Sequence, residues 1–270
     1  MGQSILTSLH GRTAGITHRG DMLSKGFVAS ANEGNQIQYG GPRTVSWFDD
    51  FLGDVIADQY SVVEGTDSAT SNAAILAGGI GGVLRITSGD AGTGLAADLI
   101  EVVQALQWQA SNGGLSAQTR IKLGRITDAY VFFGFTDVVT LEAPIISAAS
   151  ADTFTSNASD AVGFMFDTRM ATDNWWATGV AADVDATHVN TGIAPVADDY
   201  TTLRLDVDSA GKAKFYINGV QVAQLSGAVT AATDLTPVIA LGNTSGTTAL
   251  TMDVDYLHFA MDRAVDGDAV

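Results

Sequence analysis

The sequence predicts an all-β fold, an antiparallel two-sheet jelly-roll sandwich preceded by an extended N-terminal arm. About a dozen short stretches alternate apolar and polar residues or are rich in β-branched and aromatic residues. Only four of the 30 acidic residues are glutamate, and 30 glycines are present, which is typical of turns and strand ends and not of helix surfaces. Because strands without crossover helices pack as antiparallel sheets, we expect a sandwich or jelly roll.

The strand signals begin near Trp47 and are dense from Val83 onward. Residues 83–87 follow a glycine-rich turn, and residues 119–123 alternate cleanly between apolar and charged side chains. Residues 130–135 and 162–166 are almost continuously apolar, which predicts strands buried on both faces. The one helix candidate is Ala96–Gln109, although Ile100, Val102 and Val103 within it disfavour a helix.

The clearest pattern is a three-stranded meander over Thr201–Leu225. Its second turn is Asn218-Gly219, the dipeptide that type I′ hairpins prefer because both positions need positive φ. The closing strand, Leu250 to about Met261, changes the parity of its apolar residues near Tyr256. A regular strand cannot change faces, so we expect a bulge or burial on both sides at that point.

Charge divides the chain into an arm, a sandwich and a short tail. Residues 1–43 carry four cations against two acids, a net +2, and residues 44–270 carry nine cations against 28 acids, a net −19. We therefore predict an arm over 1–43, a sandwich over 44–263 and a polar tail over 264–270. An unstructured N-terminal tail without a partner is the alternative.

Composition excludes several classes of function. The net charge of −17 disfavours a general nucleic-acid binder, because phosphate binding needs a basic surface. The absence of cysteine excludes disulfides, thiolate nucleophiles and cysteine zinc sites. With neither a basic leader nor an apolar run of membrane-spanning length, we expect a soluble protein made in a cytoplasm, without a membrane partner.

Residues from about Ser46 to Met261 resemble the concanavalin A-like lectin/glucanase sandwich in its laminin-G-like form. The matching segments, in chain order, are Trp47–Phe51, Gly82–Ile86, Ala129–Phe135, Tyr200–Asp208, Phe215–Gly219 and Met252–Tyr256. The resemblance implies the fold but not the function, because this sandwich hosts lectins, glycosidases and structural modules. The acidic, cysteine-free sandwich on a short arm also resembles virion proteins of tailed bacteriophages.

Catalytic residues are not predicted. Glucanases with this sandwich use two glutamates on one strand face, whereas no glutamate here has another within thirty positions. The aspartate pairs Asp206/Asp208 and Asp253/Asp255 alternate outward and are expected to be solvated. No Gly-x-Ser-x-Gly motif is present. We therefore expect a protein that is not an enzyme.

No cofactor or metal site is predicted, although calcium is an open alternative. The oxygen-rich segments Asp167–Asn174 and Asp183–Asp185 could supply ligands, and His188 lies close to the second, but neither has EF-hand spacing. The candidate glycan-binding or interface aromatics are Trp108, Trp175 and Trp176. Because neighbours on a strand point to opposite faces, at most one of Trp175 and Trp176 should lie in the core.

The leading hypothesis is a non-enzymatic bacteriophage virion protein, a capsid decoration (cement) protein on the capsid exterior. The arm would contact the major capsid protein and neighbouring copies through its basic residues Arg12, His18, Arg19, Lys25 and Arg43. A homotrimer is the preferred assembly. The alternative is a lectin-like receptor-binding module of a tail or head fibre, which would bind a host-surface glycan. A glycan hydrolase is a further alternative, disfavoured by the absent glutamate pair.

Overall fold

The computed structural model describes residues 44–67, 69–140, 143–151 and 153–262, with the backbone of two short strands before them. Those strands, β1 (Phe27–Ala29) and β2 (Gln36–Gln38), pair antiparallel within the segment predicted to be an arm. The basic residues assigned to that arm lie outside the described residues: Arg12, His18, Arg19, Lys25 and Arg43. The tail 264–270 also lies outside them.

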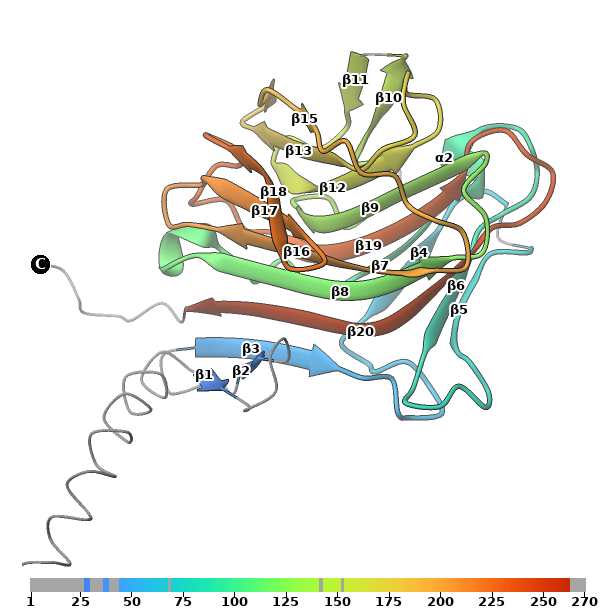
Figure 1. Cartoon of the computed structure of the whole chain (residues 1–270), viewed down its shortest axis with the longest axis horizontal. Coiled ribbons are helices and arrows are strands. Elements are labelled where there is room, and N and C mark those ends of the chain that lie inside the picture. The colour runs from blue at the N-terminus through green and yellow to red at the C-terminus, as the bar shows by residue number, and fades with distance from the viewer. Residues whose placement is uncertain are drawn as a thin grey trace, which may run out of the picture.

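Two large antiparallel sheets face each other, as the sequence predicts (Figure 1). In sheet I the strand order is β14 (Val184–Asp185), β13 (Trp176–Ala181), β12 (Ala161–Asp167), β9 (Ala129–Thr136), β19 (Thr236–Asn243), β7 (Ile100–Val103) and β4 (Ser61–Glu64), with β15 (Val189–Asn190) beside β13. In sheet II the order is β18 (Val220–Leu225), β17 (Ala213–Ile217), β16 (Tyr200–Val207), β8 (Leu115–Leu123), β20 (Thr251–Asp262), β6 (Leu84–Thr87) and β5 (Asn72–Ile75), with β3 (Thr44–Asp49) beside β20.

A single aromatic-rich core fills the space between the sheets. Phe133 and Phe135 of β9 point inward and meet Phe259 of β20, with ring centroids 6.3 and 6.1 Å apart. Leu203 and Leu205 of β16 reach the same core from sheet II. Period-two alternation in each strand therefore places one apolar row in the core, where burial supplies most of the stability.

A second, smaller core covers the outer face of sheet I. It is formed by the hairpin of β10 (Ile146–Ser150) and β11 (Thr153–Ser156), and by the one-turn helix α2 (Leu95–Asp98). Figure 1 shows the hairpin above β12 and β9, with α2 at the end of β19. Because Phe132 points into this second core while Phe133 points into the first, the predicted burial of β9 on both faces is confirmed.

Local predictions for the closing strand and the meander are also confirmed. The register of β20 against β8 shifts between Val254 and Tyr256, and this bulge explains the change in apolar parity. Strands β16, β17 and β18 form the predicted meander. Asn218 and Gly219 have φ values of 49° and 80° at its second turn, which few residues other than glycine and asparagine adopt.

One expectation needs correction, and the disfavoured helix candidate forms one turn before a strand. Within Ala96–Gln109 the helix is limited to the turn of α2, because the chain continues as β7 and sends Ile100 and Val102 into the main core. Asp253 was expected in solvent but is 4% exposed, because Arg85 and Lys122 cover and neutralise it. No helix among the described residues is long and apolar enough to cross a membrane.

Candidate functional site

A groove of about 1060 Å³ opens where β3 pairs with the end of β20, and we call it the Trp groove. Its walls come from β3, from the start of β4 with the residues before it, and from the segment that joins β7 to the 3-10 turn η1 (Ala110–Asn112). The side chains that give it its chemistry are Trp47, Asp58, Gln59, Gln104, Gln107 and Asn112. Aromatic, amide and carboxylate groups thus border one cavity.

Trp47 is held in a fixed orientation within this groove. Its indole Nε1–H donates a hydrogen bond of 2.7 Å to the Tyr60 hydroxyl, and the two rings meet edge to face with centroids 6.1 Å apart. Tyr60 is itself buried, which raises the pKa of its hydroxyl and keeps it neutral. The half-buried indole therefore offers an apolar surface without needing to be ordered by a ligand.

The backbone of Gln104, on the side of the Trp groove that carries the glutamine side chains, is held by hydrogen bonds to Thr236. The backbone N–H of Gln104 donates a hydrogen bond of 2.9 Å to Thr236 Oγ1. The same hydroxyl donates a hydrogen bond of 2.7 Å back to the backbone carbonyl of Gln104. The Gln104 side chain lies beside the Tyr60 hydroxyl, and its buried Nε2 makes no hydrogen bond of regular geometry among the described residues. Leu106, which is 39% exposed, adds apolar surface at the rim.

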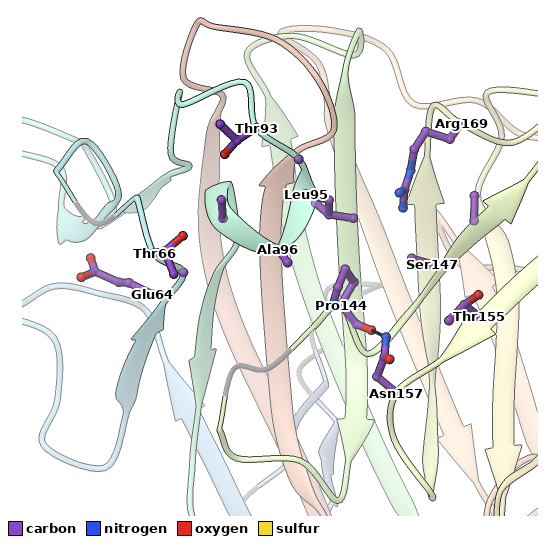
Figure 2. A pocket seen from close by; sticks show the side chains of 14 residues that line it. Glu64, Thr66, Thr93, Leu95, Ala96, Pro144, Ser147, Thr155, Asn157 and Arg169 are labelled. Carbon is purple, nitrogen blue, oxygen red and sulfur yellow. Dashed lines mark hydrogen bonds between the residues drawn. The ribbon is translucent and has the colours of Figure 1, made fainter.

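A second groove, of about 730 Å³, lies over the outer face of sheet I, and we call it the hairpin groove. Figure 2 shows Leu95 and Ala96 of α2 on one side, and Pro144 and the β10 residue Ser147 on the other. The Asn157 amide donates 2.6 Å to the Pro144 carbonyl and closes the hairpin side. No aromatic ring is among the described residues that line this groove, in contrast to the Trp groove.

An ion pair between the fully buried Asp167 and the partly exposed Arg169 borders the hairpin groove. Asp167 is fully buried, and it accepts hydrogen bonds from the Arg169 side chain and from the backbone N–H of Ala148 in β10, the last at 2.9 Å. The hydrogen bonds to Asp167 raise the pKa of Arg169. Asp167 belongs to the segment Asp167–Asn174, which the sequence offers as a possible source of calcium ligands. In the structure its carboxylate binds Arg169 and the backbone of the hairpin.

Glu101 of β7 is an acid without an ion-pair partner, buried on the outer face of sheet I beneath the hairpin and α2. It is 1% exposed, neither carboxylate oxygen has a hydrogen-bond partner, and burial raises its pKa to about 8. Burial above all, and then the charge of Glu101, raises the pKa of Tyr130, whose hydroxyl donates a hydrogen bond of 3.0 Å to the Ile146 carbonyl. The sequence signal was available: a single glutamate interrupts the strand Ile-Glu-Val-Val.

The three tryptophans singled out from the sequence have different environments. Trp108 lines the Trp groove but is only 5% exposed, because its ring packs against Phe135 and Phe259. Trp175 is fully buried in the main core and is therefore excluded as a glycan contact. Trp176 points to the other face, as predicted, and packs half-buried on the hairpin. Trp47 is predicted from the sequence only as part of a strand, yet it is the half-buried tryptophan whose ring lines the Trp groove.

Asp206, Asp255 and His188, which were considered for catalysis or metal binding, contact other residues of the sandwich. Asp255 is paired with Arg120 at 2.7 Å, and Asp206 with Arg204 at 2.8 Å. His188 lies 3.0 Å from the Gly179 carbonyl and packs edge-on against a phenylalanine. Among the described residues no group of three or more histidine, aspartate or glutamate side chains is placed to bind a metal ion.

Solved structures with the same architecture place the chain in a fold class, although no protein-family model and no curated protein matches its sequence. The chain has the concanavalin A-like lectin/glucanase sandwich fold. An endo-β-1,3-glucanase from Pyrococcus furiosus is similar over 89% of this chain and 99% of its own, with a TM-score of 0.56 and 12% identity.

Carbohydrate-recognition proteins are similar to the same degree. The carbohydrate recognition domain of Emp47p matches 83% of this chain and 99% of its own, with a TM-score of 0.56 and 9% identity. Peanut lectin matches 82% and 99%, with a TM-score of 0.52 and 12% identity. At such identities the likeness concerns the fold alone, and the fold hosts both enzymes and lectins.

Proposed function

We propose that this protein is a non-enzymatic carbohydrate-binding sandwich and that the Trp groove is its glycan site. The observation that carries the proposal is the fixed, half-buried Trp47 indole on a cavity that also exposes amide side chains. A sugar ring has an apolar C–H face and a polar rim of hydroxyls. An aromatic face beside glutamine and asparagine amides matches both surfaces, because amides donate and accept hydrogen bonds.

The cavity also has the dimensions and composition of a ligand site. Its volume of about 1060 Å³ can accommodate an oligosaccharide, and it combines apolar residues such as Leu106 with a few convergent polar groups. Gln107 and Asn112 add further amide donors and acceptors to the lining of the same cavity. Two of the similar solved structures are carbohydrate-recognition proteins, which is consistent with the proposal.

Binding without cleavage is supported by the acid content of the groove. Glycosidic hydrolysis uses two carboxyl groups that flank the bond, roughly 5 Å apart in retaining enzymes and somewhat further in inverting ones. Asp58 is the one acid among the described residues that line the Trp groove. The buried Glu101 is absent from that lining and faces no second carboxylate that shifts its pKa.

The experiment is a binding titration of the full chain with soluble β-glucan oligosaccharides, galactosides and mannosides, chosen after a glycan-array screen. Trp47→Ala and Gln107→Ala should each weaken binding of the glycan that the screen identifies by tenfold or more. Trp176→Ala, a half-buried tryptophan outside the groove, is the matched control and should leave binding within twofold. Absence of binding across the array, or equal effects of the three variants, would overturn the proposal. Release of reducing ends from any bound glycan would overturn its non-enzymatic part.

A role as a virion decoration protein is the second candidate, and one structural relationship favours it. Thr44 and Asp262 are cross-strand partners in β3 and β20, so the first and last residues of the described sandwich lie side by side. A basic segment that precedes Thr44 would therefore attach the sandwich by one end, and the acidic body would project from the particle. The partner would be the major capsid protein, with other copies of this chain as neighbours.

Particle binding can be tested apart from glycan binding. Replacing Arg12, Arg19, Lys25 and Arg43 by glutamate in the full chain should abolish co-sedimentation with phage capsids. Arg125→Glu with Lys212→Glu is the control on the sandwich itself and should preserve co-sedimentation. Full capsid occupancy by the arm variant, or no occupancy by the unmodified chain, would contradict this candidate.

A further inference from the structure

Positive charge is distributed unevenly between the Trp groove and the rest of the sandwich. The described residues include eight cations: Arg85, Arg120, Lys122, Arg125, Arg169, Arg204, Lys212 and Lys214. None of these eight is among the residues that line the Trp groove. Five of them are held in ion pairs elsewhere in the sandwich, with Asp167, Asp206, Asp253 and Asp255. The described part of the chain therefore brings no positive side chain to this groove.

Asp58 is the one charged side chain among the described residues that line the Trp groove. It is exposed, lies shortly before β4, and makes no ion pair among the described residues. Its carboxylate is therefore not neutralised by a neighbouring cation. A ligand in the groove meets this negative charge beside polar groups that are otherwise amides and hydroxyls.

The groups next to the lining add negative charge or none. The Asp262 carboxylate lies against Gly113, the residue after the lining residue Asn112, and a Cβ on Gly113 would come within 2.5 Å of its Oδ2. His258 Nε2 lies 3.3 Å from the hydroxyl of Ser46, which also lines the groove. Burial above all lowers the pKa of His258 to about 4, so its ring is uncharged at neutral pH.

An acidic sugar is disfavoured in this groove for two reasons. Its anionic group would lose water without gaining a cationic partner, and an anion desolvated in this way is costly. It would also be repelled by the Asp58 carboxylate, although solvent screens this repulsion because Asp58 is exposed. A neutral sugar has neither cost, because it needs an aromatic face and amide hydrogen bonds, and the groove supplies both.

We infer that the Trp groove is selective for uncharged glycans, that it rejects sugars bearing a carboxylate or a sulfate group, and that Asp58 determines this selectivity. The inference rests on the proposed glycan site and adds the class of ligand that the site takes. A binding site can exclude a competitor of similar shape by leaving the competitor's charge unpaired or opposed. The excluded classes are uronic acids, sialic acids and sulfated sugars.

The test compares pairs of glycans that differ in one group. A β-1,3-glucan tetrasaccharide, N-acetyllactosamine and mannotriose are each titrated into the full chain beside a form in which one C6 hydroxymethyl is oxidised to a carboxylate. In each pair that binds, the neutral member should bind at least fivefold more tightly at near-physiological salt. Asp58→Asn keeps the shape of the side chain and removes its charge. It should reduce this ratio at least twofold and leave the binding of the neutral member within twofold.

Asp173→Asn is the matched control for Asp58→Asn. Asp173 is exposed, follows β12, and is not among the residues that line the Trp groove. Its replacement makes the same change in net charge and should leave the ratio unchanged. Equal effects of the two variants would overturn the role of Asp58.

Salt dependence gives a second measurement that needs no variant. Added salt screens repulsion, so it should tighten the binding of the carboxylated member and leave the dissociation constant of the neutral member within twofold. Equal affinities within the pairs, tighter binding of the carboxylated member, or its release by salt would each overturn the inference and leave the glycan site itself intact. No binding of any pair, or of any glycan on the array, would overturn the proposed function and this inference with it.

Discussion

Arg169 binds both carboxylate oxygens of Asp167, with Nε–Oδ1 and Nη2–Oδ2 distances of 3.0 and 2.6 Å. Asp167 is fully buried at the end of β12, and the Ala148 N–H of the hairpin donates to the same carboxylate. One acid thus connects sheet I to the segment that covers it. The hydrogen bond from the Ala148 N–H to Asp167 fixes the position of β10, which forms one side of the hairpin groove.

Asp167→Asn should destabilise the protein by about 2–4 kcal/mol, because the fully buried side chain loses its charge and one of the two acceptor oxygens that bind Arg169 and the Ala148 N–H. Urea unfolding measures the loss, and limited proteolysis should show faster cleavage between 143 and 156. Asp206→Asn is the matched control: its pair with Arg204 lies on an open face, so the loss should be below about 1 kcal/mol. Equal losses would contradict the structural role of Asp167.

Glu101 predicts a dependence of stability on pH. Its pKa is raised from 4.5 to about 8 in the fold, so the native state retains a proton that the unfolded chain has released. Stability should therefore fall as pH rises from about 4.5 to about 8, by at most about 1.4 kcal/mol per pH unit from this group. Glu101→Gln should flatten the profile in that window when denaturation is followed at several pH values. An unchanged slope would mean that Glu101 is ionised in the native state.

His258 predicts the opposite dependence at lower pH. Burial, and to a lesser extent the nearby Arg204, lowers its pKa from 6.5 to about 4 in the fold. The unfolded chain then binds a proton that the native state does not, so stability is lost as pH falls from about 6.5 toward 4. An NMR titration of the ring protons should give a midpoint near 4. A midpoint near 6.5 would show that the ring is solvated.

Two glycines in one loop should respond differently to alanine. Gly82 has a φ of +78°, and a Cβ there would collide with the backbone of Asp50 and Phe51. Gly78 has nearly the same φ, +77°, but open space around it. Gly82→Ala should cost about 3 kcal/mol or more, and Gly78→Ala about 1 kcal/mol, measured by thermal or urea unfolding. Similar costs at both positions would mean that the approach of the loop to Phe51 is not as close as described.

The fold was predictable because its strongest signals are local. The alternation through the meander, the Asn218-Gly219 turn and the parity change at Tyr256 each follow from backbone geometry and are present in the structure. The hairpin β10–β11 was not predicted, because its alanines, serines and threonines give little periodicity. Its position depends on tertiary contacts such as the Ala148–Asp167 hydrogen bond.

The candidate site was less predictable than the fold, because distant segments form it. Trp47 lies in β3, and the pairing of β3 with β20 joins residues more than 200 positions apart. Gln104 and Gln107 follow β7 in a segment whose sequence suggested the end of a helix. Trp108 is a candidate from the sequence, but its burial depends on contacts with Phe135 and Phe259, which lie far from it in the chain. Residue type alone could not distinguish the buried Trp175 from the presented Trp47.

The most direct test of the glycan site is an NMR map of the full chain during titration with a glycan that it binds. The indole Nε1–H resonance of Trp47 and the side-chain amide resonances of Gln104, Gln107 and Asn112 should shift together along one saturation curve. The glycan should be recovered uncleaved at the end. Shifts confined to residues of the hairpin groove, such as Thr93, Ser147 and Thr155, would contradict the assignment of the Trp groove.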